Sequence, residues 1–148
     1  MEVCPMINVY TDGSCLLETG QGGWAYILDY KGYRKIGANH ESNTTNNRME
    51  LTAVLEALYA IKDTSIPVTI YTDSKYVILA YSNRLKWSAN HYRSANGKPL
   101  ANQDLLKFLL QRAKDFTSLR FEWVKAHNGD QWNEYADEIA SYAANHVP

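Results

Sequence analysis

The chain has 148 residues, of which 45% are hydrophobic and 21% charged, and its formal net charge is −1. This length and composition predict one globular domain over residues 1–148 and exclude a disordered or fibrous chain. No basic leader and no apolar stretch of membrane-spanning length is present, so we expect a cytoplasmic protein with no membrane partner. Cys4 and Cys15 are too few for a disulfide framework, and both are expected to be reduced.

The first part of the chain predicts three antiparallel strands and a helix. Residues 7–14 alternate apolar and β-branched side chains, as a buried strand does, and carry Asp12 near their end. Residues 24–30 and 33–39 predict two more strands around a tight turn at Lys31 and Gly32. A polar loop then leads into a helix that runs to about residue 62, with Thr44 or Thr45 as its N-cap.

A second strand-like run, residues 68–74, repeats the Tyr-Thr-Asp of the first strand and places Asp73 at its end. Because a helix separates this run from the first three strands, we expect it to pair in parallel with one of them through a right-handed crossover. If it lies beside the first strand, Asp12 and Asp73 meet at one edge of the sheet. Two such carboxylates repel each other and require a shared proton or a bound cation.

The rest of the chain predicts mainly helices. Ser74 is placed to cap a short helix that ends near residue 82, and residues 83–90 predict another. A loop rich in Asn, Gly and Pro over 94–99 precedes a helix over 100–114. A strand over 119–124 and an alanine-rich helix over 131–145 follow. This order of elements predicts an α/β fold in which helices cover a mixed sheet.

Two of these helices carry an acid on a face that otherwise suits the core. Glu50 shares its face with Val54, and Asp137 stacks with Ala140. Each acid has an ordinary alternative, since Glu50 can interact with the positive end of its helix and Asp137 can face solvent beside Glu138.

Together with the two strand-end acids, these residues make four carboxylates, and few His or Cys ligands accompany them. Oxygen ligands favour hard divalent cations, with Mg²⁺ first and Mn²⁺ as a substitute. Two such ions about 4 Å apart can bind the attacking water and the leaving oxygen of a phosphodiester. The four acids therefore predict hydrolysis of nucleic acid.

Positive charge is concentrated between residues 74 and 103, where the chain has no Asp or Glu. This segment interleaves Lys and Arg with Tyr and Trp, a pattern that suits a phosphate backbone with exposed sugar or base faces. The alternative is a solvated helical surface whose aromatic side chains pack into the core.

Four motifs resemble type 1 ribonuclease H. They are Thr-Asp-Gly-Ser-Cys at 11–15, Thr-Thr-Asn-Asn-Arg-Met-Glu-Leu at 44–51, Thr-Asp-Ser at 72–74, and the segment from Trp123 to Asp137. The resemblance covers nearly the whole chain and implies a ribonuclease H-like fold, an α/β fold with a five-stranded mixed sheet. Its strand order is 3-2-1-4-5, strands 1 to 3 are antiparallel, and helices flank the sheet. The implied activity is hydrolysis of the RNA strand of RNA/DNA hybrids, leaving 5′-phosphate and 3′-hydroxyl ends.

The resemblance implies that the four acids bind two Mg²⁺ ions, or Mn²⁺ in their place, when substrate is present. Asp12 would bridge both ions, Asp73 would serve the ion that activates water, and Glu50 would serve the ion at the leaving group, with Asp137 as the fourth ligand. His127 corresponds to a loop residue that assists proton transfer or product release. Without the resemblance, His127 is more simply a strand-end histidine with a backbone partner.

The resemblance also implies the contacts with an RNA/DNA hybrid. Thr45 corresponds to a contact with a DNA-strand phosphate, and Asn46 and Asn47 to contacts with sugars and base edges, although all three also suit loop and cap positions. Lys75 replaces a frequent Gln and is expected to contact phosphate. A basic protrusion at about 83–99 is expected to grip the DNA strand. The side chains expected to bind there are Lys86, Trp87, Tyr92 and Arg93.

Two departures from the family pattern predict modest affinity for the hybrid. Glu18 stands where many relatives have an Asn that contacts the RNA. Between its two aromatic residues the protrusion has Ser-Ala-Asn-His, where familiar bacterial members carry a denser basic cluster. Fewer phosphate contacts predict weaker binding and a shallower salt dependence.

Two other functions fit the same motifs. One is a catalytically silent module that binds RNA/DNA hybrids, and the other is a different nuclease of the superfamily, such as a junction resolvase or an integrase core. The motif at 44–51 argues against the second. From a short chain that begins at Met1, we expect a stand-alone monomeric enzyme. The alternative is a domain excised from a larger polymerase-type protein.

Overall fold

The computed structural model describes residues 5–125 and 130–146. The strands in these ranges are β1 (Ile7–Cys15), β2 (Gly22–Tyr30), β3 (Tyr33–Glu41), β4 (Val68–Thr72) and β5 (Leu119–Trp123). The helices are α1 (Asn46–Ala60), α2 (Lys75–Ser82), α3 (Arg84–Ala89), α4 (Gln103–Ala113) and α5 (Gln131–Asn145). None of these described helices has the length and apolarity needed to cross a membrane.

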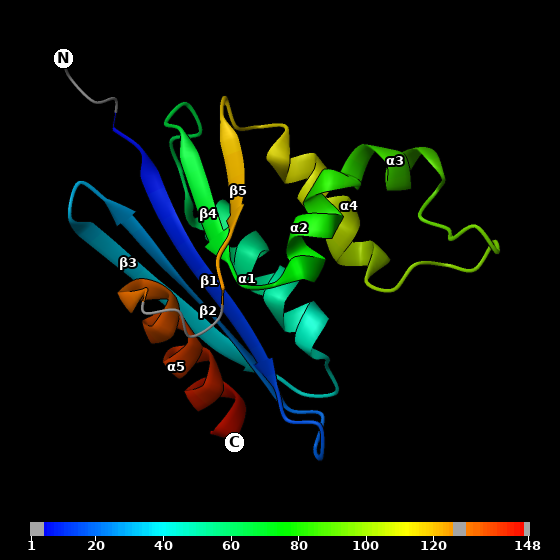
Figure 1. Ribbon diagram of the computed structural model, residues 1–148, viewed down its shortest axis with the longest axis horizontal. Helices are drawn as coiled ribbons and strands as arrows, with labels where there is room; N and C mark the ends of the chain where they lie inside the picture. Colours follow the sequence, from blue (N-terminus) through cyan, green and yellow to red (C-terminus); the bar gives the residue numbers. More distant parts are fainter. Residues whose placement is uncertain (1–4, 126–129, 147–148) are drawn as a thin grey trace.

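The strands form one mixed sheet in the order β3-β2-β1-β4-β5, which confirms the predicted topology (Figure 1). β2 pairs antiparallel with β1 and with β3, whereas β4 pairs in parallel with β1 and with β5. The predicted tight turn between β2 and β3 is present, with positive φ angles of 52° at Lys31 and 83° at Gly32. The parallel pairing of β1 with β4 fixes the position of the candidate site.

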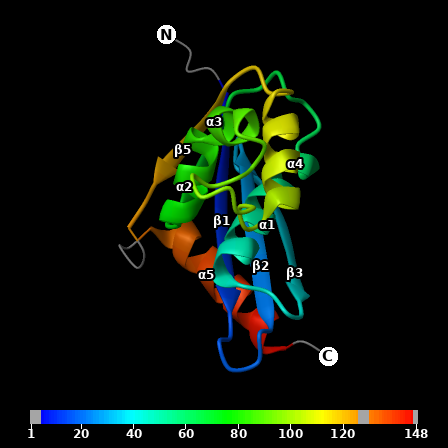
Figure 2. The same ribbon diagram turned by 90° about the vertical axis from the view of Figure 1, so that its right-hand side faces the viewer.

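Helices cover both faces of the sheet. Among the described helices, α1 to α4 lie on one side and α5 lies alone on the other (Figures 1 and 2). The larger core lies between α1 and the sheet, where Val9, Leu51, Leu58 and Ile70 are fully buried. Removal of these apolar side chains from water holds α1 against the strands.

α5 approaches the sheet closely because its buried residues are small. These residues are Ala136, Ala140 and Ala144. A Cβ atom on Gly23 of β2 would lie only 2.4 Å from the carbonyl oxygen of Ala140, so this approach requires glycine at position 23. The alanine-rich sequence of α5 thus permits a close contact between helix and sheet.

Caps and a left-handed residue set the helix boundaries. Thr45, and not Thr44, is the N-cap of α1, and Ser74 caps α2 as predicted. α4 begins at Gln103 and not at the predicted residue 100, because Asn102 adopts a φ of 64°, which a helix excludes. Cys15 is a free thiol as expected, and Cys4 lies outside the described residues.

Candidate active site

β1 and β4 bring two acids to the same edge of the sheet. Tyr10 lies opposite Tyr71 in the parallel ladder, so Asp12 and Asp73, each two residues further on, follow on neighbouring strands. α1 packs against β1 and contributes Glu50. One carboxylate oxygen from each of the three acids lies within 4.8 Å of the others. The convergence predicted from the repeated strand motif is present.

Glu50 is held in place by the backbone of β1. The Gly13 N–H donates a hydrogen bond of 2.8 Å to Glu50 Oε1. A Cβ atom on Gly13 would lie 2.3 Å from the backbone nitrogen of Glu50, so only glycine lets α1 come this close to β1. The sequence motif places Gly13 after Asp12, but the contact across 37 residues could not be predicted from local sequence.

The second Glu50 oxygen shows that the site lacks a hydrogen-bond donor for a buried carboxylate. Glu50 is only 7% exposed, and its Oε2 atom is buried with no hydrogen-bond partner among the described residues. Asp12, which is 5% exposed, lies beside it. A buried carboxylate oxygen without a donor is costly, so a proton or a cation must stabilise this pair.

The pKa values of the two buried acids show that burial side by side disfavours their ionised forms. Burial, followed by the neighbouring carboxylates, raises the pKa of Asp12 to about 12. Burial also raises the pKa of Glu50 to about 7, although the hydrogen bonds from Asp12 and from the Gly13 N–H oppose this shift. Without a cation, Asp12 therefore retains a proton that it shares with Glu50. These oxygen-only donors suit Mg²⁺ or Mn²⁺, which would replace that proton.

α5 contributes a fourth acid from the opposite face of the sheet. Asp137 is half-buried, makes a side-chain hydrogen bond with Asp12, and raises the pKa of Glu50 through its charge. It therefore faces the other acids and not the solvent, unlike Glu138, which is exposed. The predicted set of four acids lies together in the structure.

Trp123 supports the end of β4, a role that the sequence did not reveal. Its indole N–H donates a hydrogen bond of 3.1 Å to the carbonyl oxygen of Asp73. The ammonium group of Lys75, two residues after Asp73, lies 5.5 Å from the centre of the Trp123 ring. His127, the predicted proton-transfer residue, lies outside the described residues.

The start of α1 lies beside Glu50 and exposes the predicted hybrid-reading residues. Thr45, Asn46 and Asn47 are all exposed, and Thr45 Oγ1 accepts a hydrogen bond from the Arg48 N–H. Thr45 thus caps the helix and leaves part of its side chain accessible. Glu18 is also exposed, in the turn between β1 and β2.

An ion pair that was not predicted from the sequence connects the start of α1 to α4. The guanidinium of Arg48 contacts both carboxylate oxygens of Asp104, at 3.0 and 2.6 Å. This bidentate pair lowers the pKa of Asp104 to about 2. Arg48 belongs to the predicted motif at 44–51, but no local pattern identifies a partner 56 residues away.

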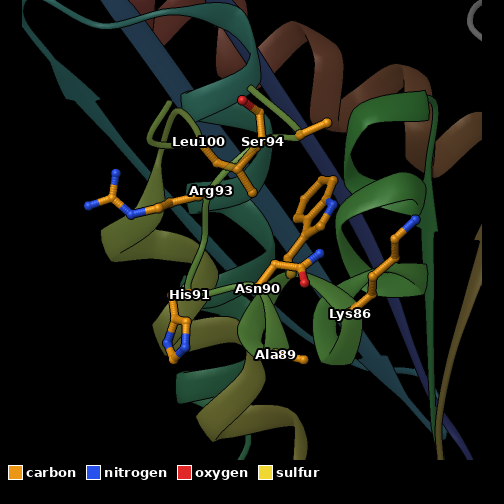
Figure 3. A pocket seen from close by; sticks show the side chains of 9 residues that line it. Lys86, Ala89, Asn90, His91, Arg93, Ser94 and Leu100 are labelled. Carbon is orange, nitrogen blue, oxygen red and sulfur yellow. The ribbon is translucent and has the colours of Figure 1, made fainter. Parts of the chain in front are cut away.

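The predicted basic protrusion consists of α3 and the loop that follows it. Its surface is hollowed by a cavity of about 580 Å³ lined by Lys86, Trp87, Asn90, His91 and Arg93, among others. In Figure 3, Lys86 and Arg93 extend in opposite directions with Asn90 between them. Both cationic side chains belong to exposed residues, as a phosphate-binding surface requires.

The two aromatic residues of the protrusion differ in accessibility. Trp87 is half-buried, whereas Tyr92 is only 8% exposed and belongs to the hydrophobic core. Lys107 of α4 lies 5.6 Å from the centre of the Tyr92 ring. Tyr92 therefore has little surface for a nucleotide and instead packs the protrusion against α4.

Known proteins resemble the chain in sequence and in structure. The family model described as RNase H matches residues 5–145. Ribonuclease H of Caldicellulosiruptor saccharolyticus is 43% identical over 136 residues, which cover 90% of this chain and 92% of that protein. Ribonuclease H of Campylobacter jejuni serotype O:6 is 45% identical over 139 residues, covering 93% and 90% of the two chains. The crystal structure of LC9-RNase H1, a type 1 RNase H with the type 2 active-site motif, matches with a TM-score of 0.82 and 30% identity, covering 98% of this chain and 74% of that one.

Proposed function

The chain belongs to the ribonuclease H family, and on that basis we propose that it is a metal-dependent endoribonuclease specific for RNA/DNA hybrids. It hydrolyses the RNA strand and leaves 5′-phosphate and 3′-hydroxyl ends. The observation that carries the proposal is the buried cluster of Asp12, Glu50 and Asp73, with one Glu50 oxygen unpartnered among the described residues. This cluster suits a pair of divalent cations, not a merely structural role.

The four acids would hold two Mg²⁺ ions when substrate is bound, with Mn²⁺ as a substitute. These ions supply activation of water and stabilisation of the leaving oxygen. Asp12, which makes side-chain hydrogen bonds with both Glu50 and Asp137, would serve both ions. Asp73 would serve the ion on the side of the attacking water, and Glu50 the ion on the side of the leaving group. The Gly13 N–H orients Glu50 for this task.

The start of α1 and the protrusion bind the two strands of the hybrid. Asn46 and Asn47 can both donate and accept hydrogen bonds, as recognition of a ribose 2′-hydroxyl requires. Thr45 and Lys75 contact phosphates on either side of the carboxylate cluster. At the protrusion, the DNA strand is bound by Lys86, Trp87 and Arg93, while Tyr92 supports them from within.

The remaining parts of the proposal concern the whole chain. Residues 1–148 form one catalytic domain with its protrusion at about 83–99, and the enzyme acts as a monomer in the cytoplasm. His127 assists proton transfer or product release at the carboxylate cluster. An imidazole can both accept and donate a proton, which suits either step.

The proposal is tested with an RNA/DNA hybrid labelled on each strand in turn. We expect cleavage of the RNA strand alone, in the presence of Mg²⁺ and not of chelator, with duplex DNA and duplex RNA left intact. Asp73→Asn should abolish this cleavage, while Asp115→Asn, an exposed acid far along the chain from the cluster, should retain it. Analysis of the product ends then distinguishes 5′-phosphate from other chemistry.

A catalytically silent hybrid-binding module is the alternative function. It would bind hybrid equally well with and without chelator and leave both strands intact. Cleavage of a branched DNA junction in preference to the hybrid would instead identify a junction resolvase. Either result would overturn the proposed activity, and both can be read from the same substrate panel.

A further inference from the structure

The outer side of α5 carries a row of large side chains beside a cavity. Among the described helices, α5 alone covers its face of the sheet, so only its inner side is packed (Figure 1). Tyr135, Ile139 and Tyr142 follow one another at helical spacing, and with Glu138 they line a cavity of about 280 Å³. Tyr135 is 42% exposed and Tyr142 is 65% exposed. A contiguous exposed row of this kind is typical of an interaction surface.

This surface points away from the carboxylate cluster. Around a helix with 3.6 residues per turn, Asp137 lies about 160° from Tyr135 and about 140° from Tyr142. The side that carries the two tyrosines instead borders β3, because the guanidinium of Arg34 in β3 lies 4.2 Å from the centre of the Trp132 ring. A ligand bound beside the tyrosines therefore leaves the carboxylate cluster open.

Two further rings hold the tyrosines in place. The Trp132 ring packs edge-on against Tyr135, with the ring centres 6.3 Å apart and an angle of 74° between the planes. His146 stacks on Tyr142, with the ring centres 3.8 Å apart and an angle of 12°. Because Trp132 precedes Tyr135 and His146 follows Tyr142, both contacts lie outside the segment that lines the cavity. The two tyrosines are thus ordered before a ligand arrives, which lowers the entropy cost of binding.

The surroundings of the cavity are acidic. Glu138 is exposed and is the charged residue among the four that line the cavity. α5 also contains Glu134 and Asp137, and it has no Lys or Arg. The nearby pair of Arg34 and Asp29, joined at 3.5 Å, keeps both of its charges and so adds little net charge. This surface therefore attracts cations and repels phosphate.

From these features we propose that the cavity binds an arginine side chain of a partner protein. A guanidinium is planar and stacks on aromatic faces, so it fits between Tyr135 and Tyr142, which lie about 10 Å apart along α5. Glu138 accepts hydrogen bonds from the guanidinium, and half-buried Ile139 contacts the hydrocarbon part of the arginine. The proposal goes beyond hybrid cleavage and does not depend on it. Such a partner would attach to the nuclease while the carboxylate cluster stays accessible.

The test titrates the isotope-labelled, full-length protein with a capped peptide that has one arginine between two leucines, followed by NMR. We expect saturable shifts of the backbone amide signals between Tyr135 and Tyr142, and none in β4. The same peptide with glutamine in place of arginine should bind about tenfold more weakly, because it loses both the contact with the rings and the ion pair.

Variants locate the binding site on α5. Tyr142→Ala should weaken peptide binding about fivefold, as expected for a contact between a cation and an exposed ring, whereas Tyr142→Phe keeps the ring and should retain the affinity. Glu138→Gln should weaken binding about threefold. Glu56→Gln, which changes an exposed acid on α1, is the matched control and should leave binding unchanged. All of these variants should cleave hybrid as the unchanged protein does, since none alters the carboxylate cluster.

The amide spectrum of each variant checks that it is folded. If Tyr142→Ala does not fold, the comparison of Glu138→Gln with Glu56→Gln decides. No saturable binding, equal binding of the glutamine peptide, or equal affinities of Glu138→Gln and Glu56→Gln would overturn the proposal. So would α5 signals that shift with protein concentration but not with peptide, which would assign this surface to a second copy of the chain.

Discussion

Asp12 lies among three other carboxylates. This placement makes it central to the proposed site but lowers the stability of the folded state. Burial and like charge both disfavour its ionised form. The folded protein therefore keeps the acid at the expense of stability, as active sites commonly do.

Replacing Asp12 by Asn removes the charge and preserves the shape. We expect Asp12→Asn to raise the free energy of unfolding of the metal-free protein at pH 7 by on the order of 2 kcal/mol, because Asp12 must take up a proton on folding to lie beside Glu50, whereas Asn is already neutral. Cleavage of hybrid should fall at least about 100-fold, because a metal ligand is lost. Urea unfolding in chelator and a hybrid cleavage assay measure the two effects. Glu138→Gln, an exposed acid next to Asp137, should change neither, and a less stable Asp12→Asn would contradict the argument.

Gly13 is the second residue on which the geometry of the site depends. In Gly13→Ala the added Cβ atom would meet the Glu50 backbone nitrogen at 2.3 Å, so α1 must move away from β1. We expect a loss of about 3 kcal/mol of stability, since backbone cannot yield as a flexible side chain does. Thermal unfolding followed by circular dichroism measures this loss. Ser14→Ala, one residue later on β1, should cost far less, and equal losses would show that the contact with α1 is unimportant.

Helices and strands were predicted correctly where interactions between residues close in sequence determine them, and wrongly where tertiary contacts determine them. Alternation predicted β1, and Ser74 predicted the start of α2, because both depend on neighbouring residues. The start of α4 was wrong because Asn102 adopts its left-handed conformation in a tertiary setting, with its amide donating to the Tyr76 hydroxyl. Long-range packing likewise buries Tyr92.

The candidate site follows the same rule. Its four acids could be predicted because each stands at a strand end or on a helical face whose pattern is visible in the sequence. The contacts that orient them could not be predicted, because the Gly13–Glu50 and Trp123–Asp73 hydrogen bonds join residues far apart in the chain. Motif resemblance identifies which residues take part but gives no information about what holds them.

The N-cap of α1 is expected to serve both stability and binding. Thr45→Ala removes the hydroxyl that accepts the Arg48 N–H, so we expect a loss of about 1 kcal/mol of stability. It should also weaken hybrid binding, since the proposed phosphate contact disappears. Thr45→Ser keeps the hydroxyl and should preserve both properties. Unfolding and hybrid-binding titrations of the two variants separate the roles, and intact binding by Thr45→Ala would refute the phosphate contact.

The protrusion of α3 and its loop is expected to contribute salt-dependent affinity. Lys86→Ala and Arg93→Ala should each weaken hybrid binding and lower the slope of log affinity against log salt by about 1, because each removes one phosphate contact. Binding titrations in chelator at several salt concentrations measure the slope. Lys114→Ala, at the end of α4, serves as the control. Unchanged slopes in both protrusion variants would remove this surface from the proposed binding site.

Across the whole molecule, the carboxylate cluster joins the two helical layers. Glu50 comes from α1 on one face of the sheet and Asp137 from α5 on the other, while β1 supplies Asp12 between them. The cluster therefore exists only when both layers are packed on the sheet. A cation that binds all of these acids binds the folded state alone and must stabilise it.

This linkage predicts how stability responds to pH. Folding raises the pKa of Asp12 above 3.8 and that of Glu50 from 4.5 to about 7, so the folded state binds more protons than the unfolded state in the range between. Metal-free protein should therefore lose stability as the pH rises from about 4 to 7. Because Mg²⁺ displaces these protons, it should raise the melting temperature more at pH 8 than at pH 5. Thermal unfolding at both pH values, with Mg²⁺ and with chelator, measures the difference. Asp12→Asn should flatten the metal-free pH dependence, whereas an equal Mg²⁺ effect at the two pH values would show that the cation does not replace the shared proton.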